Sequence, residues 1–132
     1  MKIILAISAV VAASFVSGIA MADGGQPLSQ DELQQLLPGA KVEITNPDNS
    51  KSTWTNAADG SVDAHWLSGD PTSKHAYNGN GTGTWKISGD GKFCAHIQWR
   101  KGVTDWCRAV VKQDDGSFVL DGSPGLKMVV SR

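Results

Sequence analysis

Turn sequences that interrupt the chain at short, regular intervals constrain its fold more than any other feature. Each combines Asp, Asn or Ser with Gly or Pro, residue types that accept the backbone conformations of tight hairpins. They are Asn46-Pro47-Asp48-Asn49, Asp59-Gly60, Asp90-Gly91, Asp115-Gly116 and Gly122-Ser123-Pro124-Gly125. Segments this short between such turns predict β-strands.

We therefore expect eight strands and a mainly β fold. Consecutive short strands predict an antiparallel meander that forms a small eight-stranded barrel, with a β-sandwich as the alternative. The polar stretch from Ser68 to Gly81 is predicted to be a long loop and is a candidate ligand site, as the alternative to the barrel interior. The expected strands are Lys41–Thr45, Ser52–Asn56, Ser61–Trp66, Thr82–Ser88, Lys92–Gln98, Val103–Lys112, Ser117–Leu120 and Leu126–Val130.

One short helix precedes the strands. Ser29 is a favourable N-cap, and Glu32 completes a capping box three residues later. Leucines at helical spacing follow, and Pro38-Gly39 ends the helix. The leucines are Leu33, Leu36 and Leu37. We expect this helix to cap the barrel.

Cys94 and Cys107 are the only two cysteines, and one hairpin register brings them together. A four-residue loop from Trp99 to Gly102, with Gly102 in a left-handed conformation, sets them directly opposite each other. In an oxidising compartment the pair is predicted to form a disulfide, worth about 3 kcal/mol. The same register gives one apolar face, predicted to point into the core: Phe93, Ala95, Ile97, Trp106 and Val110.

The first residues have the pattern of an export signal. A positively charged start precedes an apolar run from Ile3 to Val16, and Ala20-Met21-Ala22 fits a signal-peptidase site. The run is shorter than the about 20 residues that span a membrane. We expect a signal peptide at residues 1–22, a single β-rich domain at 23–132 without a membrane span, and a periplasmic or secreted location. An uncleaved anchor is the alternative.

The charges exclude one class of partner. The chain has 12 Lys and Arg against 13 Asp and Glu, and both signs are scattered. Because no basic stripe is present to neutralise phosphates, nucleic acid is not an expected partner. No cofactor is expected, and no metal, since three histidines lack chelating spacing. These are His65, His75 and His96.

A catalytic centre is not indicated either. His96 and Asp105 pair across the hairpin, and these are two of the three residue types of a hydrolytic triad. No nucleophile follows in a recognisable elbow, so the pair is interpreted as a cross-strand surface contact and no catalytic residue is assigned.

Five tryptophans are many for a domain of this size. Large aromatic side chains either fill a small barrel or line a ligand site. One hypothesis places Trp85 and Trp106 in the barrel interior, with Arg108 as the anchor for an anionic ligand. A second gives Trp99, Arg100 and Lys101 an exposed position at a hairpin tip, where they dock a partner. The five are Trp54, Trp66, Trp85, Trp99 and Trp106.

The run GTWKISGDGKFCAHIQWRKGVTDWCR, from Gly83 to Arg108, resembles a family of small exported proteobacterial proteins whose domain has no assigned function. The resemblance implies export and a β-rich fold and brings no catalytic residues. Gly83-Thr84-Trp85 is also similar to the G-x-W of lipocalins, although it lies mid-chain here. The matching positions are Leu37-Pro38-Gly39, Asp59-Gly60, Gly83-Thr84-Trp85, Asp90-Gly91-Lys92, Cys94, Trp99 and Cys107.

These observations favour a non-enzymatic binding or accessory protein of the cell envelope that takes a small ligand in a β-barrel. Its expected partner is an unidentified small molecule, or an envelope or secreted protein. A secreted inhibitor or effector that docks a hydrolase through the hairpin tip at 99–102 is the alternative. A hydrolase is the third and least favoured interpretation.

Overall fold

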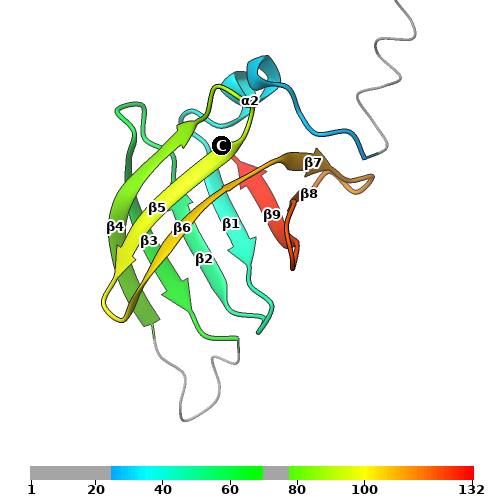
Figure 1. Cartoon of the computed structure of the whole chain (residues 1–132). Helices are drawn as coiled ribbons and strands as arrows, with labels where there is room; N and C mark the ends of the chain where they lie inside the picture. Colours follow the sequence, from blue (N-terminus) through cyan, green and yellow to red (C-terminus); the bar gives the residue numbers. More distant parts are fainter. Residues whose placement is uncertain (1–24, 70–77) are drawn as a thin grey trace, which may run out of the picture.

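The computed structural model describes residues 25–69 and 78–132, which form one short helix and nine strands (Figure 1). The predicted signal peptide lies outside the described residues. The helix, α2, spans Gln30–Leu36. The strands are β1 (Lys41–Thr45), β2 (Lys51–Thr55), β3 (Ser61–Leu67), β4 (Asn78–Ile87), β5 (Phe93–Trp99), β6 (Gly102–Arg108), β7 (Val110–Lys112), β8 (Phe118–Leu120) and β9 (Leu126–Ser131).

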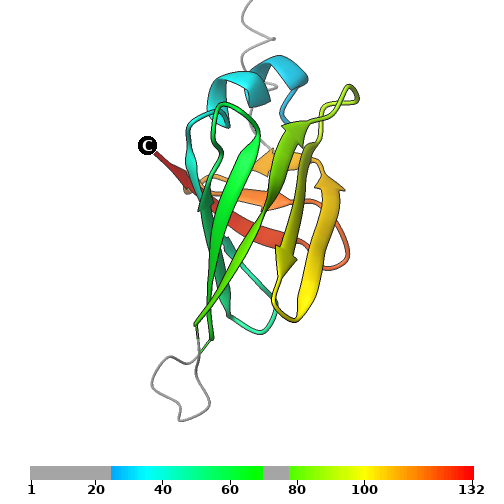
Figure 2. The same cartoon turned by 90° about the vertical axis from the view of Figure 1, so that its left-hand side faces the viewer.

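The strands of the described ranges belong to one antiparallel sheet, in the order β6-β5-β4-β3-β2-β1-β9-β8-β7. The two end strands, β6 and β7, are consecutive in the chain and Ala109 alone separates them. The sheet therefore curls until its two ends meet at Ala109, which makes a nearly closed barrel (Figures 1 and 2). The predicted barrel is confirmed, and the sandwich alternative is not observed because the strands form a single sheet.

Two strand predictions need correction. The single strand expected over Val103–Lys112 is divided, because at Ala109 the chain leaves one end of the sheet and enters the other. This division gives nine strands instead of eight. β4 begins at Asn78 and not at Thr82, so the last part of the predicted loop from Ser68 to Gly81 pairs with β3.

Four hairpins are closed by the same type of turn. In the turn at 46–50, the Asn46 amide donates to the Ser50 carbonyl at 2.8 Å, and the Asn49 amide donates back to the Asn46 carbonyl at 2.9 Å. The turns at 57–61, 88–92 and 113–117 repeat both bonds. The fourth residue of each turn has a positive φ, from 70° to 88°, which favours Gly or Asn. These residues are Asn49, Gly60, Gly91 and Gly116.

The Asp before each of these residues fixes its turn. Asp59 Oδ1 accepts hydrogen bonds from the amide nitrogen and the hydroxyl of Ser61, at 2.9 and 2.7 Å. These donors stabilise the carboxylate and lower the pKa of Asp59 below its ordinary value of 3.8. Side-chain hydrogen bonds from serine lower the pKa of the corresponding residues in the other three turns, namely Asp48, Asp90 and Asp115.

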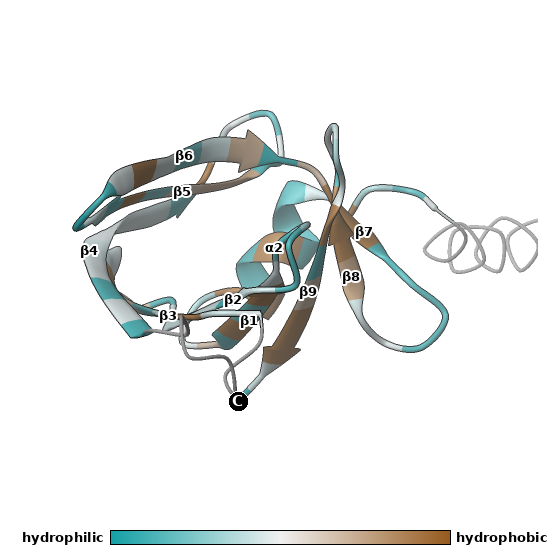
Figure 3. Ribbon diagram, turned by 90° about the horizontal axis from the view of Figure 1, so that it is seen from below, coloured by the Kyte–Doolittle hydropathy of each residue, from teal (hydrophilic) through white to brown (hydrophobic). Residues whose placement is uncertain are grey.

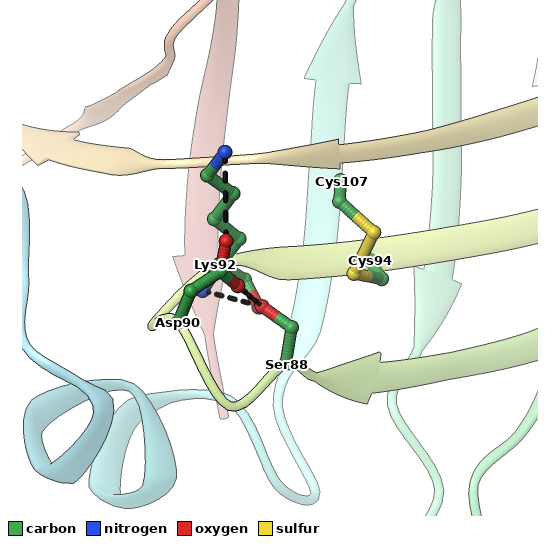
Figure 4. Close-up of polar contacts among 5 residues, drawn as sticks. All are labelled: Ser88, Asp90, Lys92, Cys94 and Cys107. Atoms are coloured by element: carbon green, nitrogen blue, oxygen red, sulfur yellow. Dashed lines mark hydrogen bonds and ion pairs between the residues drawn. A yellow bond between two sulfur atoms is a disulfide. The ribbon is translucent and has the colours of Figure 1, made fainter.

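Figure 4 shows the turn between β4 and β5, where lysine replaces the last serine. The Ser88 hydroxyl donates to Asp90 Oδ1, and Lys92 Nζ lies 3.7 Å from Asp90 Oδ2. The same view shows the disulfide between Cys94 of β5 and Cys107 of β6, with a Cα–Cα distance of 4.0 Å. The predicted disulfide is confirmed.

The register of this hairpin is the predicted one, but its turn is shorter. Cys94 pairs with Cys107, and Trp99 pairs with Gly102, so that Arg100 and Lys101 alone form the turn. The observed loop is one residue shorter at each end than the predicted one, so the pairing of the two strands is the same. Gly102 is a strand residue without the positive φ expected for it.

The helix closes one end of the barrel. Its predicted capping box is present: Glu32 N donates to Ser29 Oγ at 3.2 Å, and Ser29 N donates to Glu32 Oε1 at 2.8 Å. Leu33 and Leu37 are fully buried in the barrel interior. Seen from the opposite end, α2 lies across the far end of the barrel (Figure 3).

Asn56 and Arg132 fix the C-terminal end of α2. Asn56 is fully buried, accepts from Trp54 Nε1 at 2.8 Å and donates Nδ2 to the Leu37 carbonyl at 3.2 Å. The Arg132 guanidinium donates to the last carbonyls of the helix and beyond, where a positive charge is favourable. These are the carbonyls of Gln35, Leu36 and Pro38, at 2.9–3.0 Å.

Phe93 lies at the centre of the core. Its ring contacts those of Trp54 and Trp85 at 6.4 Å between centroids and that of Trp106 at 5.4 Å. The face predicted for the core is confirmed: Phe93, Ala95, Ile97 and Val110 are buried, and the partly buried Trp106 packs against them. Within the described residues, no helix has the length and apolar character needed to cross a membrane.

Candidate functional site

The end of the barrel opposite α2 contains a pocket of about 760 Å³, which we call the mouth pocket. Three hairpins contribute to it: the one joining β1 and β2, the one formed by β3 and β4, and the one joining β5 and β6. Figure 3 looks into the barrel from this end. The volume is within the range of small-molecule sites, about 300–1,000 Å³. The side chains that line it include Asn46, Ser52, Trp66, Trp99, Lys101 and Thr104.

Glycines of β4 make room for the two tryptophans of the pocket. Gly79 pairs with Trp66 of β3, and Gly81 pairs with Trp99 of β5. A Cβ atom at Gly81 would lie 2.7 Å from Cε3 of Trp99, so the indole ring rests directly on the glycine backbone. The glycines therefore leave β4 without side chains between the two tryptophans, and any larger residue at position 81 would displace Trp99.

Both indole N–H groups of the pocket are held by protein hydroxyls. Trp99 Nε1 donates to Thr104 Oγ1 at 2.8 Å, and Trp66 Nε1 donates to Ser50 Oγ at 3.2 Å. The hydrogen bonds fix the orientation of the rings at the mouth. Neither indole N–H group is therefore left to donate to a ligand in the pocket.

A small polar network supports the same wall. Asn46 Nδ2 donates to Ser50 Oγ at 3.0 Å and to Ser52 Oγ at 3.3 Å. Ser50 in turn donates its hydroxyl proton to Asp48 Oδ1 at 2.6 Å. The turn at 46–50 therefore not only closes a hairpin but also positions polar groups beside Trp66.

The three residues predicted to bind a ligand inside the barrel do not line the mouth pocket. Trp85 is buried in the core and donates Nε1 to the Ala57 carbonyl at 2.8 Å. Arg108 lies 5.9 Å from the Trp106 ring centroid and donates Nη1 to the Pro124 carbonyl at 2.8 Å. Arg108 thus joins β6 to the turn between β8 and β9, and a ligand-binding role for the three stays a prediction.

The hairpin tip is part of the mouth pocket. Trp99, Arg100 and Lys101 all line it. The expectation that Trp99 is exposed is wrong, because its ring is half-buried on Gly81 and tied to Thr104. The tip therefore presents two exposed cations and no protruding aromatic side chain. Docking of a protein partner through it stays a prediction.

His96 and Asp105 lie on the outer face of the barrel. Their side chains are 57% and 73% exposed, and His96 Nδ1 is 3.5 Å from Asp105 Oδ1. Neither residue lines the mouth pocket. The pair matches the surface contact that we expect from the hairpin register.

The other histidines show no metal centre. His65 Nδ1 is 2.7 Å from Asn80 Oδ1 on the exposed face of the sheet, and His75 lies outside the described residues. Across residues 25–69 and 78–132, no group of three or more His, Cys, Asp or Glu side chains is arranged to hold a metal ion.

The sequence analysis did not identify one wall of the mouth pocket. Trp66, Asn46 and Ser52 come from segments that are separate in the chain, and only the curling of the sheet brings them beside Trp99. One local signal was available: glycines alternate at positions 79, 81 and 83 of β4, a spacing that leaves one strand face without side chains.

Comparison of the chain with family models, curated proteins and solved structures found no match. The resemblance to exported proteobacterial proteins therefore stays a prediction. Fold and pocket together define a structural class: a helix-plugged antiparallel β-barrel with a tryptophan-lined pocket at its open end.

Proposed function

We propose that this protein is a non-enzymatic, exported binding protein of the cell envelope that takes a small ligand in the mouth pocket. One observation carries the proposal: a pocket of about 760 Å³ lined by Trp66 and Trp99 lies at the end of the barrel opposite α2. Aromatic walls with a few oriented polar groups are typical of small-molecule sites.

The contrast between the two barrel ends supports this function. At the α2 end, Leu33 and Leu37 fill the interior and are fully buried. At the mouth, Ser52, Gly79 and Thr104 lie beside the two tryptophans and leave space between them. A barrel that had only to be stable would bury apolar side chains at both ends.

Binding is tested by NMR on the tryptophan indoles. The five tryptophans give separate indole N–H signals, so a site at the mouth shifts those of Trp66 and Trp99 and leaves those of Trp54 and Trp85 unchanged. The protein is titrated with a panel of ring-containing fragments. In a second experiment, native mass spectrometry of protein purified from its own host detects a ligand that co-purifies. A panel without any shift of the two mouth indoles, combined with an unliganded native mass, contradicts the proposal.

A pocket-filling variant sharpens the test. A Cβ atom at Gly79 would meet Trp66 at 3.8 Å, an ordinary contact, so Gly79→Val adds a side chain to the pocket from a position that accepts a Cβ. We expect Gly79→Val to abolish the fragment shifts. Thr82→Val, on the exposed face of the same strand, is the matched control and keeps them.

A further inference from the structure

The mouth pocket also indicates the chemical class of its ligand, an inference that rests on the proposed function. Of the described residues that line it, Arg100 and Lys101 carry charge and none carries a carboxylate. Both cations are exposed, and neither forms a salt bridge within the described part of the chain. Within the described lining of the pocket, the charge therefore comes from these two positive groups.

The uncharged groups point to the same chemistry. Ser52 Oγ accepts from Asn46, and Thr104 Oγ1 accepts from Trp99. A hydroxyl that accepts one hydrogen bond still has its own proton to donate. The wall of the pocket thus offers hydroxyl, ammonium and guanidinium donors, which match a ligand rich in acceptors.

Two acidic side chains of the hairpins that form the pocket, among the described residues, are engaged elsewhere. Asp48 is engaged by the amide and hydroxyl of Ser50, at 3.0 and 2.6 Å, and is not a lining residue. Asp105 points to the outer face of β6, where it pairs with His96. Both carboxylates are therefore directed toward protein groups outside the pocket.

We infer that the ligand is a small anion with one flat ring face, which stacks beside Trp99 while its negative group meets Arg100 and Lys101. An aromatic carboxylate and an acidic sugar share this chemistry. The ring face uses the carbon surface of the Trp99 indole, whose N–H group is already bonded, and the anion uses the charged hairpin tip.

Two pairs of probes test the inference by NMR and calorimetry. 2-Naphthoate is compared with the neutral 2-naphthamide, and galacturonate with the neutral galactose. We expect the anion of at least one pair to bind about tenfold more tightly than its neutral partner, since charge-assisted hydrogen bonds contribute this much. The pair that shows the difference distinguishes an aromatic from a sugar ligand.

The double substitution Arg100→Gln and Lys101→Gln removes the anion preference and its sensitivity to added salt. Lys41→Gln with Lys86→Gln changes the net charge equally at exposed positions outside the pocket and retains the preference. Equal binding of neutral and anionic probes at the mouth indoles overturns the anion inference and leaves the proposed function standing. Absence of binding by all four probes also overturns it, while the fragment panel and the native mass decide the proposed function separately.

Discussion

Asn56→Ala removes the side chain that joins the helix to the barrel. The carboxamide of Asn56 is fully buried and forms two hydrogen bonds, with Trp54 Nε1 at 2.8 Å and the Leu37 carbonyl at 3.2 Å. A buried polar group left without its partner costs about 1–3 kcal/mol. Two such groups predict a loss of about 3 kcal/mol in the free energy of unfolding, or about 12 °C in Tm for a domain of this size.

The assay is urea unfolding followed by far-UV circular dichroism, since changes at tryptophan alter the fluorescence signal. Asn80→Ala, at an exposed position of β4, is the control and is expected to change stability by less than about 0.5 kcal/mol. Hydrogen exchange adds a second measurement, because loss of the Leu37 bond should raise the exchange of α2 amides more than that of β5 amides.

A double-mutant cycle tests the physical reason. Trp54→Phe eliminates the indole N–H that Asn56→Ala leaves without an acceptor. The combined variant should therefore be more stable than the sum of the two single losses predicts, by about 1 kcal/mol. Strictly additive losses would refute the hydrogen-bond argument and leave only the volume of the deleted side chain as the cause.

Three further predictions concern the barrel and its turns. Gly83→Ala should strongly destabilise the fold, because a Cβ there would overlap the His96 carbonyl oxygen, whereas Gly89→Ala, in open space, should not; thermal unfolding compares them. The hydrogen bonds from Ser61 lower the pKa of Asp59, so its contribution to stability is present above the ordinary value of 3.8 and is lost as the pH falls through the folded-state pKa. In Asp59→Asn the urea midpoint should therefore change less between neutral and acidic pH. The same change of midpoint in the variant and the parent protein would contradict this. Reduction of the disulfide should lower stability by about 3 kcal/mol without changing the sheet, as measured by unfolding with and without a thiol reductant; loss of the β signal on reduction would show that the bond holds the barrel itself.

The hairpins were predictable because their information is local. A positive φ at Gly60 or Gly116 and an Asp that accepts from the next serine are decided within five residues. The register of β5 against β6 was likewise predictable, because a short loop that sets Cys94 opposite Cys107 also places the apolar residues of β5 on one face. Local chemistry of this kind needs no knowledge of the rest of the chain.

The division at Ala109 and the early start of β4 were not predictable in this way. No turn residue marks Ala109, because the chain does not turn back there and passes from one end of the sheet to the other. The sequence Asn78-Gly79-Asn80-Gly81 has the composition of a loop, yet it forms a strand because Gly79 and Gly81 lie beneath Trp66 and Trp99. Contacts between distant hairpins override local preference at both places.

The same contacts explain why the site lies at the mouth and not among the core tryptophans. Trp54 and Trp85 have their indole N–H groups bonded inside the barrel and their rings packed around Phe93, so they stabilise the interior and leave no space beside it. Trp66 and Trp99 are bonded to hydroxyls at the rim, with glycine between them. The two glycines differ in what they permit: a Cβ at Gly81 would lie 2.7 Å from the Trp99 ring, whereas a Cβ at Gly79 would meet only Trp66, at 3.8 Å. Gly81 is therefore required by the packing of Trp99, and Gly79 is the position where an added side chain would narrow the mouth, which is why the test of the proposed function depends on it.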